Sequence, residues 1–282
     1  MPEAPEARTV ADKLRLTLLN KIITSAYKGE RASSLGFEKL KIPSTIIGVR
    51  SYGKKVLIDI EHAGNGCMIV VSLGMSGRLQ YAQGNHSHIH LGIGEYQCLG
   101  SFQILRPAFA LYFDDQRYMG HFNVIANDEV PIYFNNIGPD LLQAALDEKT
   151  YIPLEYWQHI FNIKKVKKWT LRKALIEQSL IAGIGNYLIS EICYYSGLYP
   201  ERIIETLTIE EIDRLRIVAH KILLLSYSYG GFTIESFISP DGEWGKYPAA
   251  VYGKKFDPYG NPVLATKAKD GRTSHWVPAI QH

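Results

Sequence analysis

The chain has 282 residues, of which 46% are hydrophobic and 21% charged, and its 31 lysines and arginines against 28 acidic residues leave a net charge of +3. This composition excludes a disordered polymer, and no apolar run approaches the roughly 18 residues that span a bilayer. The three cysteines are too few and too widely spaced for a disulfide scaffold, which favours a reducing, intracellular compartment, and the acidic start predicts no secretory leader. The length suits about two domains, and the small excess of positive charge is a weak indication of a polyanionic partner.

The first predicted element is an amphipathic helix over residues 9–23. Its apolar residues recur every four positions on one face: Val10, Leu14, Leu18 and Ile22. Thr9 and Asp12 resemble a capping pair at its start. From residue 40 to 125 the pattern changes to short β-rich runs at 56–60, 68–73, 89–93 and 108–113, with Gly, Asn and Asp between them. This spacing predicts an antiparallel sandwich or barrel.

The turn signal Ile137-Gly-Pro-Asp140 opens a second half whose pattern is helical through Ser228. We therefore place a hinge between two domains at 137–152. Tyr229-Gly-Gly231 ends the helical pattern, and the remaining Gly- and Pro-containing segment predicts a C-terminal hairpin.

Metal binding is not indicated by the sequence. His86, His88 and His90 alternate as metal ligands on one strand face could, but no carboxylate or cysteine has a companion spacing, so an exposed edge strand is favoured. No cysteine follows Cys193, and two histidines near the C-terminus, His275 and His282, are too few ligands for a metal.

The amino terminus is the first candidate for chemistry. Removal of the initiator methionine would leave Pro2 with a free secondary amine, which forms an iminium cation directly with an aldehyde-like carbon. Glu3 and Glu6 follow closely enough to transfer protons. The alternative is that Pro2 is an ordinary second residue with acidic neighbours.

The second candidate is the segment Leu180-Ile-Ala-Gly-Ile-Gly-Asn-Tyr187. A dinucleotide-binding fingerprint fits poorly, because a helical pattern precedes it and position 188 is leucine. A helix–turn–helix with residues 187–196 as its second helix fits better, and the helix start and Asn186 would then face a phosphate. A tight turn that uses its glycines only for packing is the alternative.

Basic residues flank this turn on both sides in the sequence. One group surrounds Trp169 and another lies near the C-terminus: Lys164, Lys165, Lys167, Lys168, Arg172, Lys173, Lys254, Lys255, Lys267, Lys269 and Arg272. Solvated helix faces often carry such runs, but two runs beside one anion-binding turn indicate a nucleic-acid surface.

Together these motifs resemble the formamidopyrimidine-DNA glycosylase/endonuclease VIII family, and more closely its endonuclease VIII-like branch. The resemblance extends from the first residue to about Trp276. The matching motifs, in chain order, are Met1-Pro-Glu-Ala-Pro-Glu6, Gly53-Lys54-Lys55, Gly74-Met-Ser-Gly77, Asp115-Gln-Arg-Tyr-Met-Gly120, Gly138-Pro139, Ala182-Gly-Ile-Gly-Asn186 with Glu191 and Gly197, and a last element from Val251 to Thr273. Each motif alone is weak, whereas their order along the whole chain is specific.

The resemblance implies an α+β fold. An N-terminal helix and antiparallel β-sandwich would occupy 1–136, a linker 137–152, and a helical domain with a helix-two-turn-helix 153–282. The family's four zinc cysteines are absent, and Tyr259 stands where the first would be. Residues 248–276 are therefore expected to form a zincless β-hairpin finger, held by its turns and by packing of Val263, Leu264 and Trp276.

The resemblance also implies a bifunctional DNA glycosylase and AP lyase of base excision repair. Pro2 would be the nucleophile, Glu3 the acid/base, Glu6 a supporting carboxylate and Lys54 a phosphate-binding cation. Met75 and Arg117 would fill the space left by an everted base. Met119 stands where many members carry a phenylalanine wedge, and Asn186 and Arg272 would bind phosphates beside the lesion.

No cofactor and no metal are expected. The implied partner is double-stranded DNA with an oxidised base, a pyrimidine or hydantoin by preference, or an abasic site, bound by a monomer that has no membrane association. Nucleus, cytoplasm and viral factory are not distinguished as the compartment. Two rival functions remain, an N-terminal-proline tautomerase and a non-catalytic nucleic-acid-binding protein.

Overall fold

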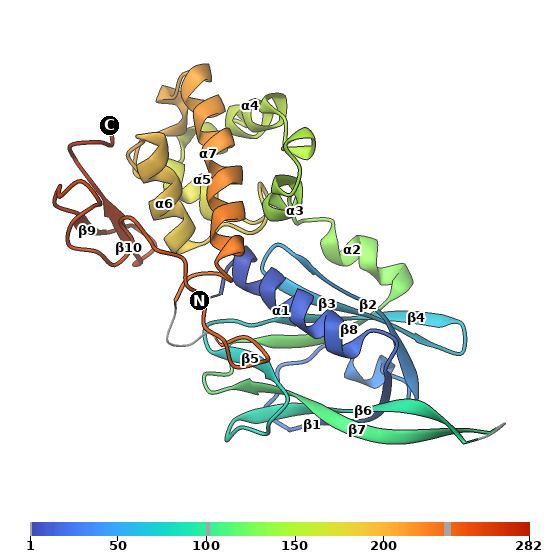
Figure 1. Ribbon diagram of the computed structural model, residues 1–282. Helices are drawn as coiled ribbons and strands as arrows, with labels where there is room; N and C mark the ends of the chain where they lie inside the picture. Colours follow the sequence, from blue (N-terminus) through green and yellow to red (C-terminus); the bar gives the residue numbers. More distant parts are fainter. Residues whose placement is uncertain (1, 100–101, 234–237) are drawn as a thin grey trace. The chain divides into compact units, whose positions relative to one another are not determined.

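The computed structural model describes residues 2–99, 102–233 and 238–282, which form two compact units (Figure 1). Unit 1 comprises Pro2, Glu6–Asn135 and the described part of Thr233–Gly245. Unit 2 comprises Glu3–Pro5, Asn136–Phe232 and Lys246–His282. The short segment that ends at Gly245 thus belongs to unit 1, and residues 3–5 belong to unit 2. The sequence-based boundaries placed both segments in the other domain.

Unit 1 is built from one long helix and an antiparallel sheet. Its elements are α1 (Ala4–Leu18), β1 (Ile22–Lys28), β2 (Ser44–Tyr52), β3 (Lys55–His62), β4 (Asn65–Ser72), β5 (Gly77–Gln80), β6 (Ser87–Leu99), β7 (Phe102–Asp115), β8 (His121–Ala126) and α2 (Val130–Phe134), with short 3₁₀ turns at Phe37–Lys39 and Asn127–Glu129. Among the described residues the strands follow the order β5-β7-β6-β1-β2-β3-β4-β8. Register shifts in β1 and β2 allow this single sheet to bend into the two layers of a sandwich (Figure 1).

The core of unit 1 shows why the β-rich runs of the sequence become strands. Alternate residues of β3, such as Val56, Ile58 and Ile60, are buried together with Leu14 and Leu18 of α1. The residue between Val56 and Ile58 is buried as well, on the opposite face of the sheet, which explains why the apolar run of this strand is continuous. The sandwich prediction is confirmed.

The first helix differs from its predicted position. It begins at Ala4, so Thr9 lies in its interior, and it ends at Leu18, followed by Asn20 in the left-handed region (φ 64°). Asparagine tolerates this conformation, which ends helices. Ile22 therefore belongs to β1, although its spacing continues the apolar face of the helix by coincidence.

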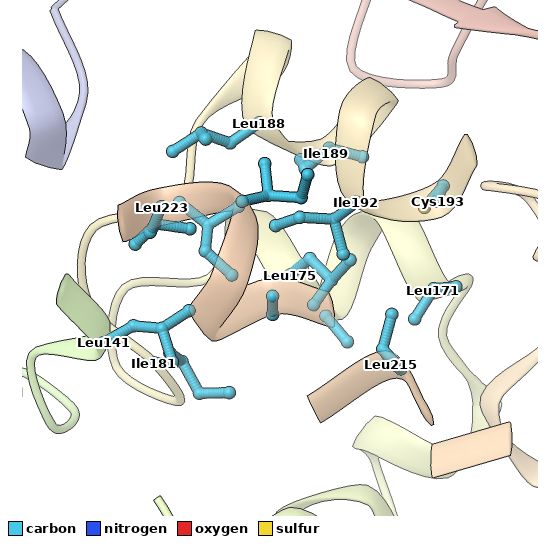
Figure 2. Close-up of a cluster of buried hydrophobic side chains, with 14 of the residues drawn as sticks. Leu141, Leu171, Leu175, Ile181, Leu188, Ile189, Ile192, Cys193, Leu215 and Leu223 are labelled. Atoms are coloured by element: carbon cyan, nitrogen blue, oxygen red, sulfur yellow. The ribbon is translucent and has the colours of Figure 1, made fainter. Parts of the chain in front are cut away.

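Unit 2 is a helical domain with a small hairpin. Its elements are α3 (Leu141–Ala145), α4 (Leu154–Asn162), α5 (Leu171–Ile176), α6 (Asn186–Ser196), α7 (Ile209–Ser228), β9 (Leu264–Lys267) and β10 (Thr273–Trp276), with 3₁₀ turns at Glu148–Thr150, Val166–Lys168 and Ile204–Thr206. Figure 2 shows its core, where Leu188 and Ile192 of α6 lie among Leu175 of α5 and Leu223 of α7. Sequence-local signals set the helix ends, as in α7, where Thr208 and Glu211 form a reciprocal capping box.

The helix-two-turn-helix and the C-terminal hairpin are confirmed. α5 and α6 flank the glycine-containing turn, and β9 pairs with β10 in antiparallel register, with Thr273 opposite Lys267 and Trp276 opposite Leu264. The expectation that Leu264 packs in the hairpin is wrong, because its side chain is 42% exposed. None of the described helices combines the length and the apolarity that crossing a membrane requires.

Candidate functional site

Glu3 supplies the missing cap of helix α6. The N-cap position of this helix is Gly185, which has no side chain to accept the free backbone N–H groups of the first turn. Tyr187 N donates to Glu3 Oε1 at 3.0 Å and Leu188 N to Glu3 Oε2 at 3.4 Å. A Cβ at residue 185 would lie 2.2 Å from Glu3 Cδ, so glycine is required there by close approach. The helix start therefore holds a carboxylate of the chain itself, where the sequence suggested only a phosphate.

Pro2 directly precedes this anchored glutamate and is buried. Glu6, on the first turns of α1, is fully buried as well. Lys54 lies elsewhere in unit 1, in the two-residue turn that joins β2 to β3, where it is half-buried. The helix start thus fixes Glu3, and the hairpin turn fixes the backbone that carries Lys54.

A buried arginine connects Asn186 with the C-terminal hairpin. Arg172 Nη2 donates to Asn186 Oδ1 at 2.8 Å and to Asp270 Oδ2 at 3.2 Å, and the Asn186 amide donates to Thr273 O at 3.1 Å. Asp270 Oδ1 in turn accepts from the backbone N–H of Arg272 at 3.0 Å. The structure thereby brings two predicted phosphate ligands, Asn186 and Arg272, into one hydrogen-bonded group within unit 2.

The charge of Asp270 depends on this group. Burial alone would raise the pKa of the Asp270 carboxyl, but the backbone N–H of Arg272 and the guanidinium of Arg172 outweigh burial and hold that pKa below its usual range. The carboxylate therefore stays charged at neutral pH and orients Arg172, whose Nε and Nη1 atoms are buried with no hydrogen-bond partner among the residues that the structure describes.

A second buried carboxylate, Glu191 on α6, organises the chain that leads into the hairpin. It accepts hydrogen bonds from the backbone N–H groups of Ala250 (2.8 Å), Val251 (3.0 Å) and Tyr252 (2.9 Å), and from Tyr247 Oη (3.2 Å). Burial, with the nearby Glu191 charge, raises the pKa of Tyr247 far above its usual value, so the phenol remains a donor. Glu191 thus joins the hairpin segment to the helix that carries Asn186.

The three predicted void-filling residues lie on two adjacent loops of unit 1. Met75 is on the loop before β5, and Arg117 and Met119 are on the loop after β7; both methionines are exposed. Gly74 (φ 61°) brings these loops together, since a Cβ there would lie 2.6 Å from the carbonyl group of Met119. The three side chains therefore belong to one region of unit 1.

One buried carboxylate holds the two loops in place. Asp115 Oδ1 accepts from Ser76 Oγ at 2.5 Å and from Arg117 N at 3.2 Å, and Asp115 Oδ2 accepts from Gly120 N at 2.7 Å. The role of Asp115 was missed in the sequence, although its place at the start of the Asp-x-Arg motif was a usable signal. Arg172 and Glu191 were also missed as positioning residues, because their partners lie far away in the sequence.

Aromatic contacts add to both regions. The ring of His88 stacks on that of Tyr118 with 4.1 Å between centroids, and His88 Nε2 donates to Asp115 O at 2.9 Å. His88 therefore belongs to the loop network. The expectation of an exposed edge strand for these histidines is wrong, because β6 lies between β7 and β1 in the sheet. In unit 2, Lys173 Nζ lies 4.5 Å and Lys165 Nζ 5.6 Å from the ring centroid of Trp169, which places cations of the first basic run around one indole.

A zinc ion does not fit the C-terminal hairpin. Tyr259 is 82% exposed, and the neighbouring Asp257 uses its carboxylate oxygens to accept from Tyr259 N, Asn261 N and Tyr194 Oη at 2.8 to 3.1 Å. No group of three His, Cys, Asp or Glu residues suited to a metal is found in the part of the chain that the structure describes. Hydrogen bonds to Asp257 shape the turn that metal ligands would otherwise define.

Comparison with known proteins agrees with this arrangement along the entire chain. Three family profiles match: the formamidopyrimidine-DNA glycosylase N-terminal domain over residues 1–122, the H2TH domain over 137–237 and the C-terminal domain over 245–282. The formamidopyrimidine-DNA glycosylase of Lactococcus lactis is 30% identical over 297 residues, and that of Thermomicrobium roseum 27% over 301; each alignment covers 100% of this chain and 99% of the relative.

Solved structures give the same result. The MutM (Fpg) protein of Thermus thermophilus superposes with a TM-score of 0.83 at 26% identity, covering 99% of this chain and 98% of that one. Lactococcus lactis Fpg superposes with a TM-score of 0.80 over 100% of both chains, at 25% identity in a complex with oxidised-pyrimidine DNA and at 26% in a complex with N7-benzyl-Fapy-dG DNA.

The fold and the matched domains define a DNA glycosylase of base excision repair. The chain belongs to the formamidopyrimidine-DNA glycosylase family. These relatives all carry the formamidopyrimidine-DNA glycosylase or Fpg name, so the endonuclease VIII-like branch stays a prediction.

Proposed function

We propose that this enzyme excises oxidised bases through a Schiff base on Pro2 and then cleaves the DNA strand as an AP lyase. The observation that carries the proposal is the anchoring of Glu3: a carboxylate that is 2% exposed, fixed on the first turn of α6 and adjacent in the chain to the prolyl nitrogen. A fixed acid/base beside a secondary amine is what glycosidic bond cleavage by an amine requires.

The proposed reaction begins with attack of the Pro2 nitrogen on C1′ of the damaged nucleotide. As the new N–C1′ bond forms, the C1′–N bond to the base breaks, and the proton lost from the prolyl nitrogen passes to the departing base. Glu3 in its protonated form then donates its proton to the ring oxygen, which opens the sugar and leaves an iminium at C1′. The iminium withdraws electrons and acidifies the C2′ protons; loss of one expels the 3′ phosphate by β-elimination, and a second, δ-elimination expels the 5′ phosphate. Hydrolysis of the iminium frees Pro2. Glu6 supports this proton transfer, and the Lys54 ammonium binds a backbone phosphate.

The DNA-binding part of the proposal assigns the remaining residues. Eversion of a base costs a few kcal/mol of lost stacking and pairing, which Met75, Arg117 and Met119 offset by filling the vacated space. Asn186 and Arg272, joined through Arg172 and Asp270, bind the flanking phosphates. Oxidised pyrimidines and hydantoins are the preferred lesions. The Lactococcus lactis relative has been solved with both oxidised-pyrimidine and Fapy DNA, so a substrate panel must include both classes.

Borohydride trapping tests the mechanism. The protein with a free Pro2 amine should form a covalent adduct with abasic and oxidised-pyrimidine duplexes, and a variant with extra residues before Pro2 should form none. Full activity of the blocked variant would remove Pro2 from the mechanism. Lesion binding without trapping or strand scission would instead indicate a non-catalytic nucleic-acid-binding protein, and weak duplex binding with carbonyl tautomerisation would indicate the tautomerase.

Glu3→Gln separates the two chemical steps. Because the opened sugar of an abasic site needs no glycosidic cleavage, this variant should still be trapped on abasic DNA while base excision falls by about 100-fold or more, the usual contribution of a general acid. Equal loss in both assays would show that Glu3 acts through the structure of α6 alone.

A further inference from the structure

Tyr118 is an exposed aromatic residue to which the resemblance assigns no role. It lies between Arg117 and Met119 on the loop after β7 and is 40% exposed, although a residue of this size gains by burial. Its backbone is in the left-handed region (φ 52°), which is unfavourable for a residue with a Cβ. Gly, Asn and Asp are the residues that usually adopt this conformation, and tyrosine is not among them. An unfavourable backbone that exposes an aromatic ring is typical of a functional position.

The surroundings of Tyr118 hold its ring in one orientation. One face of the ring stacks on His88 at 4.1 Å between centroids and an interplanar angle of 26°. His88 is itself fixed, because its Nε2 donates to the carbonyl oxygen of Asp115 at 2.9 Å, and the same carbonyl accepts from Tyr118 N at 3.4 Å. Since the Asp115 carboxylate also fixes Arg117 N and Gly120 N, the backbone on both sides of Tyr118 is anchored.

We propose that Tyr118 is a stacking residue for the base opposite the lesion, with His88 as its support. The proposal rests on the proposed function, since eversion of the damaged nucleotide leaves that base without its pairing partner, and a kink of the duplex at the same step separates it from one neighbour and exposes a face. Arg117 carries hydrogen-bond donors and no acceptor, so it can pair with the acceptor edge of the orphaned base, while a neighbouring ring with one face covered by His88 offers its other face for stacking. Stacking on a ring tolerates any base, whereas pairing by Arg117 selects among bases.

The test uses duplexes that contain a stable abasic analogue, tetrahydrofuran, opposite either a normal base or a second tetrahydrofuran. Tyr118→Leu removes the ring but keeps an apolar residue with the same backbone cost, and Tyr118→Phe keeps the ring. We expect Tyr118→Leu to raise Kd about 10-fold when a base is opposite, within the range for one base stacked on one aromatic side chain, and less than 2-fold when no base is opposite. Tyr118→Phe should stay within about 2-fold of the unmodified protein on both duplexes.

A merely structural role for Tyr118 gives a different result, because a distorted loop weakens binding to both duplexes equally. Equal losses, or no loss on either duplex, would overturn the proposal. His88→Gln keeps a donor for Asp115 but loses the supporting ring, so it should weaken binding less than Tyr118→Leu and again only when a base is opposite. Borohydride trapping of the unmodified protein, measured in parallel, reports on Pro2 separately, so failure of the proposed function is distinguishable from failure of the Tyr118 assignment.

Discussion

Unit 1 and unit 2 each fix predicted DNA-contacting residues with a buried carboxylate, but the two carboxylates bridge different lengths of chain, 39 residues or fewer for Asp115 and 59 to 61 residues for the backbone partners of Glu191. Asp115 binds groups between Ser76 and Gly120, all within strands and loops of one sheet. Glu191 binds backbone groups 59 to 61 residues away, on the segment that leads to the hairpin. The loops of unit 1 are therefore already close through strand pairing. In unit 2, residues 250–252 belong to no helix or strand, so the position of this segment beside α6 depends more on the Glu191 carboxylate.

A buried carboxylate matters most for stability where few other contacts hold its partners in place. A buried carboxylate is tolerated when several N–H groups satisfy it, and its removal leaves those groups unpaired. In unit 1, the pairing of β5 with β7 would still hold the loops near each other. In unit 2, hydrogen bonds to Glu191 and Asp257 hold the hairpin segment in the place of metal ligands. Loss of the Glu191 carboxylate should therefore be more disruptive than loss of the Asp115 carboxylate in unit 1.

The strongest test of this comparison replaces Glu191 and Asp115 by alanine in two separate variants. Glu191→Ala should lower the free energy of unfolding of unit 2 by about 3–5 kcal/mol, because three backbone N–H groups and the Tyr247 hydroxyl lose their acceptor in the interior. Asp115→Ala should cost unit 1 about 1–3 kcal/mol. Urea unfolding is followed by tryptophan fluorescence in a Trp244→Phe background, because Trp244 lies in unit 1 and the other three tryptophans, Trp157, Trp169 and Trp276, lie in unit 2. Circular dichroism of the sheet reports unit 1. An equal or larger cost for Asp115→Ala would contradict the comparison.

The pH dependence of unit 2 gives the next largest effect. Burial of His220 lowers its pKa from 6.5 to about 4, and the neutral ring accepts from Ile152 N at 3.0 Å while its Nδ1 donates to Arg216 O. A folded-state pKa below the unfolded value means that unfolding takes up a proton between these two values, so stability is complete above about pH 6.5 and falls on acidification. The loss should reach about 3 kcal/mol at pH 4, at 1.36 kcal/mol per pKa unit.

Urea unfolding at several pH values measures this loss. His220→Gln should be less stable at pH 7 and should lack the decline between pH 6.5 and 4, whereas a variant of the exposed His159 should keep it. A decline that persists in His220→Gln would assign the pH dependence to other groups.

The Arg172→Met variant tests whether the hydrogen-bonded group of unit 2 contributes to DNA binding. Without the guanidinium, Asn186 Oδ1 and Asp270 lose their common donor, and the two predicted phosphate ligands are linked only through the hydrogen bond from the Asn186 amide to Thr273 O. We expect Kd for a tetrahydrofuran duplex to rise about 10-fold, equivalent to about 1.4 kcal/mol, with a shallower dependence on salt because phosphate contacts are lost. Lys173→Met, at the next residue and on the exposed side, is the matched control and should change Kd less.

The weakest expected effect concerns an ion pair within unit 1. Lys13 of α1 contacts the carboxylates of Asp241 and Glu243, the latter at 2.6 Å, but the acidic side chains are 49% and 72% exposed. Such pairs contribute about 0–1 kcal/mol and are screened by salt. Lys13→Met should therefore shift the melting temperature by less than about 4 °C, and by less still in 1 M salt. A larger shift would show that this segment stabilises unit 1 in another way.

Local signals in the sequence determined the secondary structure to a large extent. Short β-rich runs bounded by Gly, Asn and Asp predicted strands such as β3 and β4, the glycine pair at 230 and 231 predicted the end of α7 at Ser228, and the Gly-Pro-Asp turn predicted the start of α3. These features depend on a few neighbouring residues, because turn conformations and the alternation of strand faces are properties of short segments. The start of α1 was misplaced because Thr9 and Asp12 imitate a cap, and the left-handed Asn20 that ends this helix left no clear pattern.

The sequence by itself also determined the family and the identity of most candidate residues, since the order of short motifs along the chain is specific. Only the tertiary structure decided what those residues contact. Glu3 caps a helix 184 residues away, Arg172 joins Asn186 to Asp270, and His88 supports Tyr118 across two strands. A buried polar group takes whichever partner the folded chain brings within hydrogen-bond distance, and no local pattern encodes a partner that lies a hundred residues away.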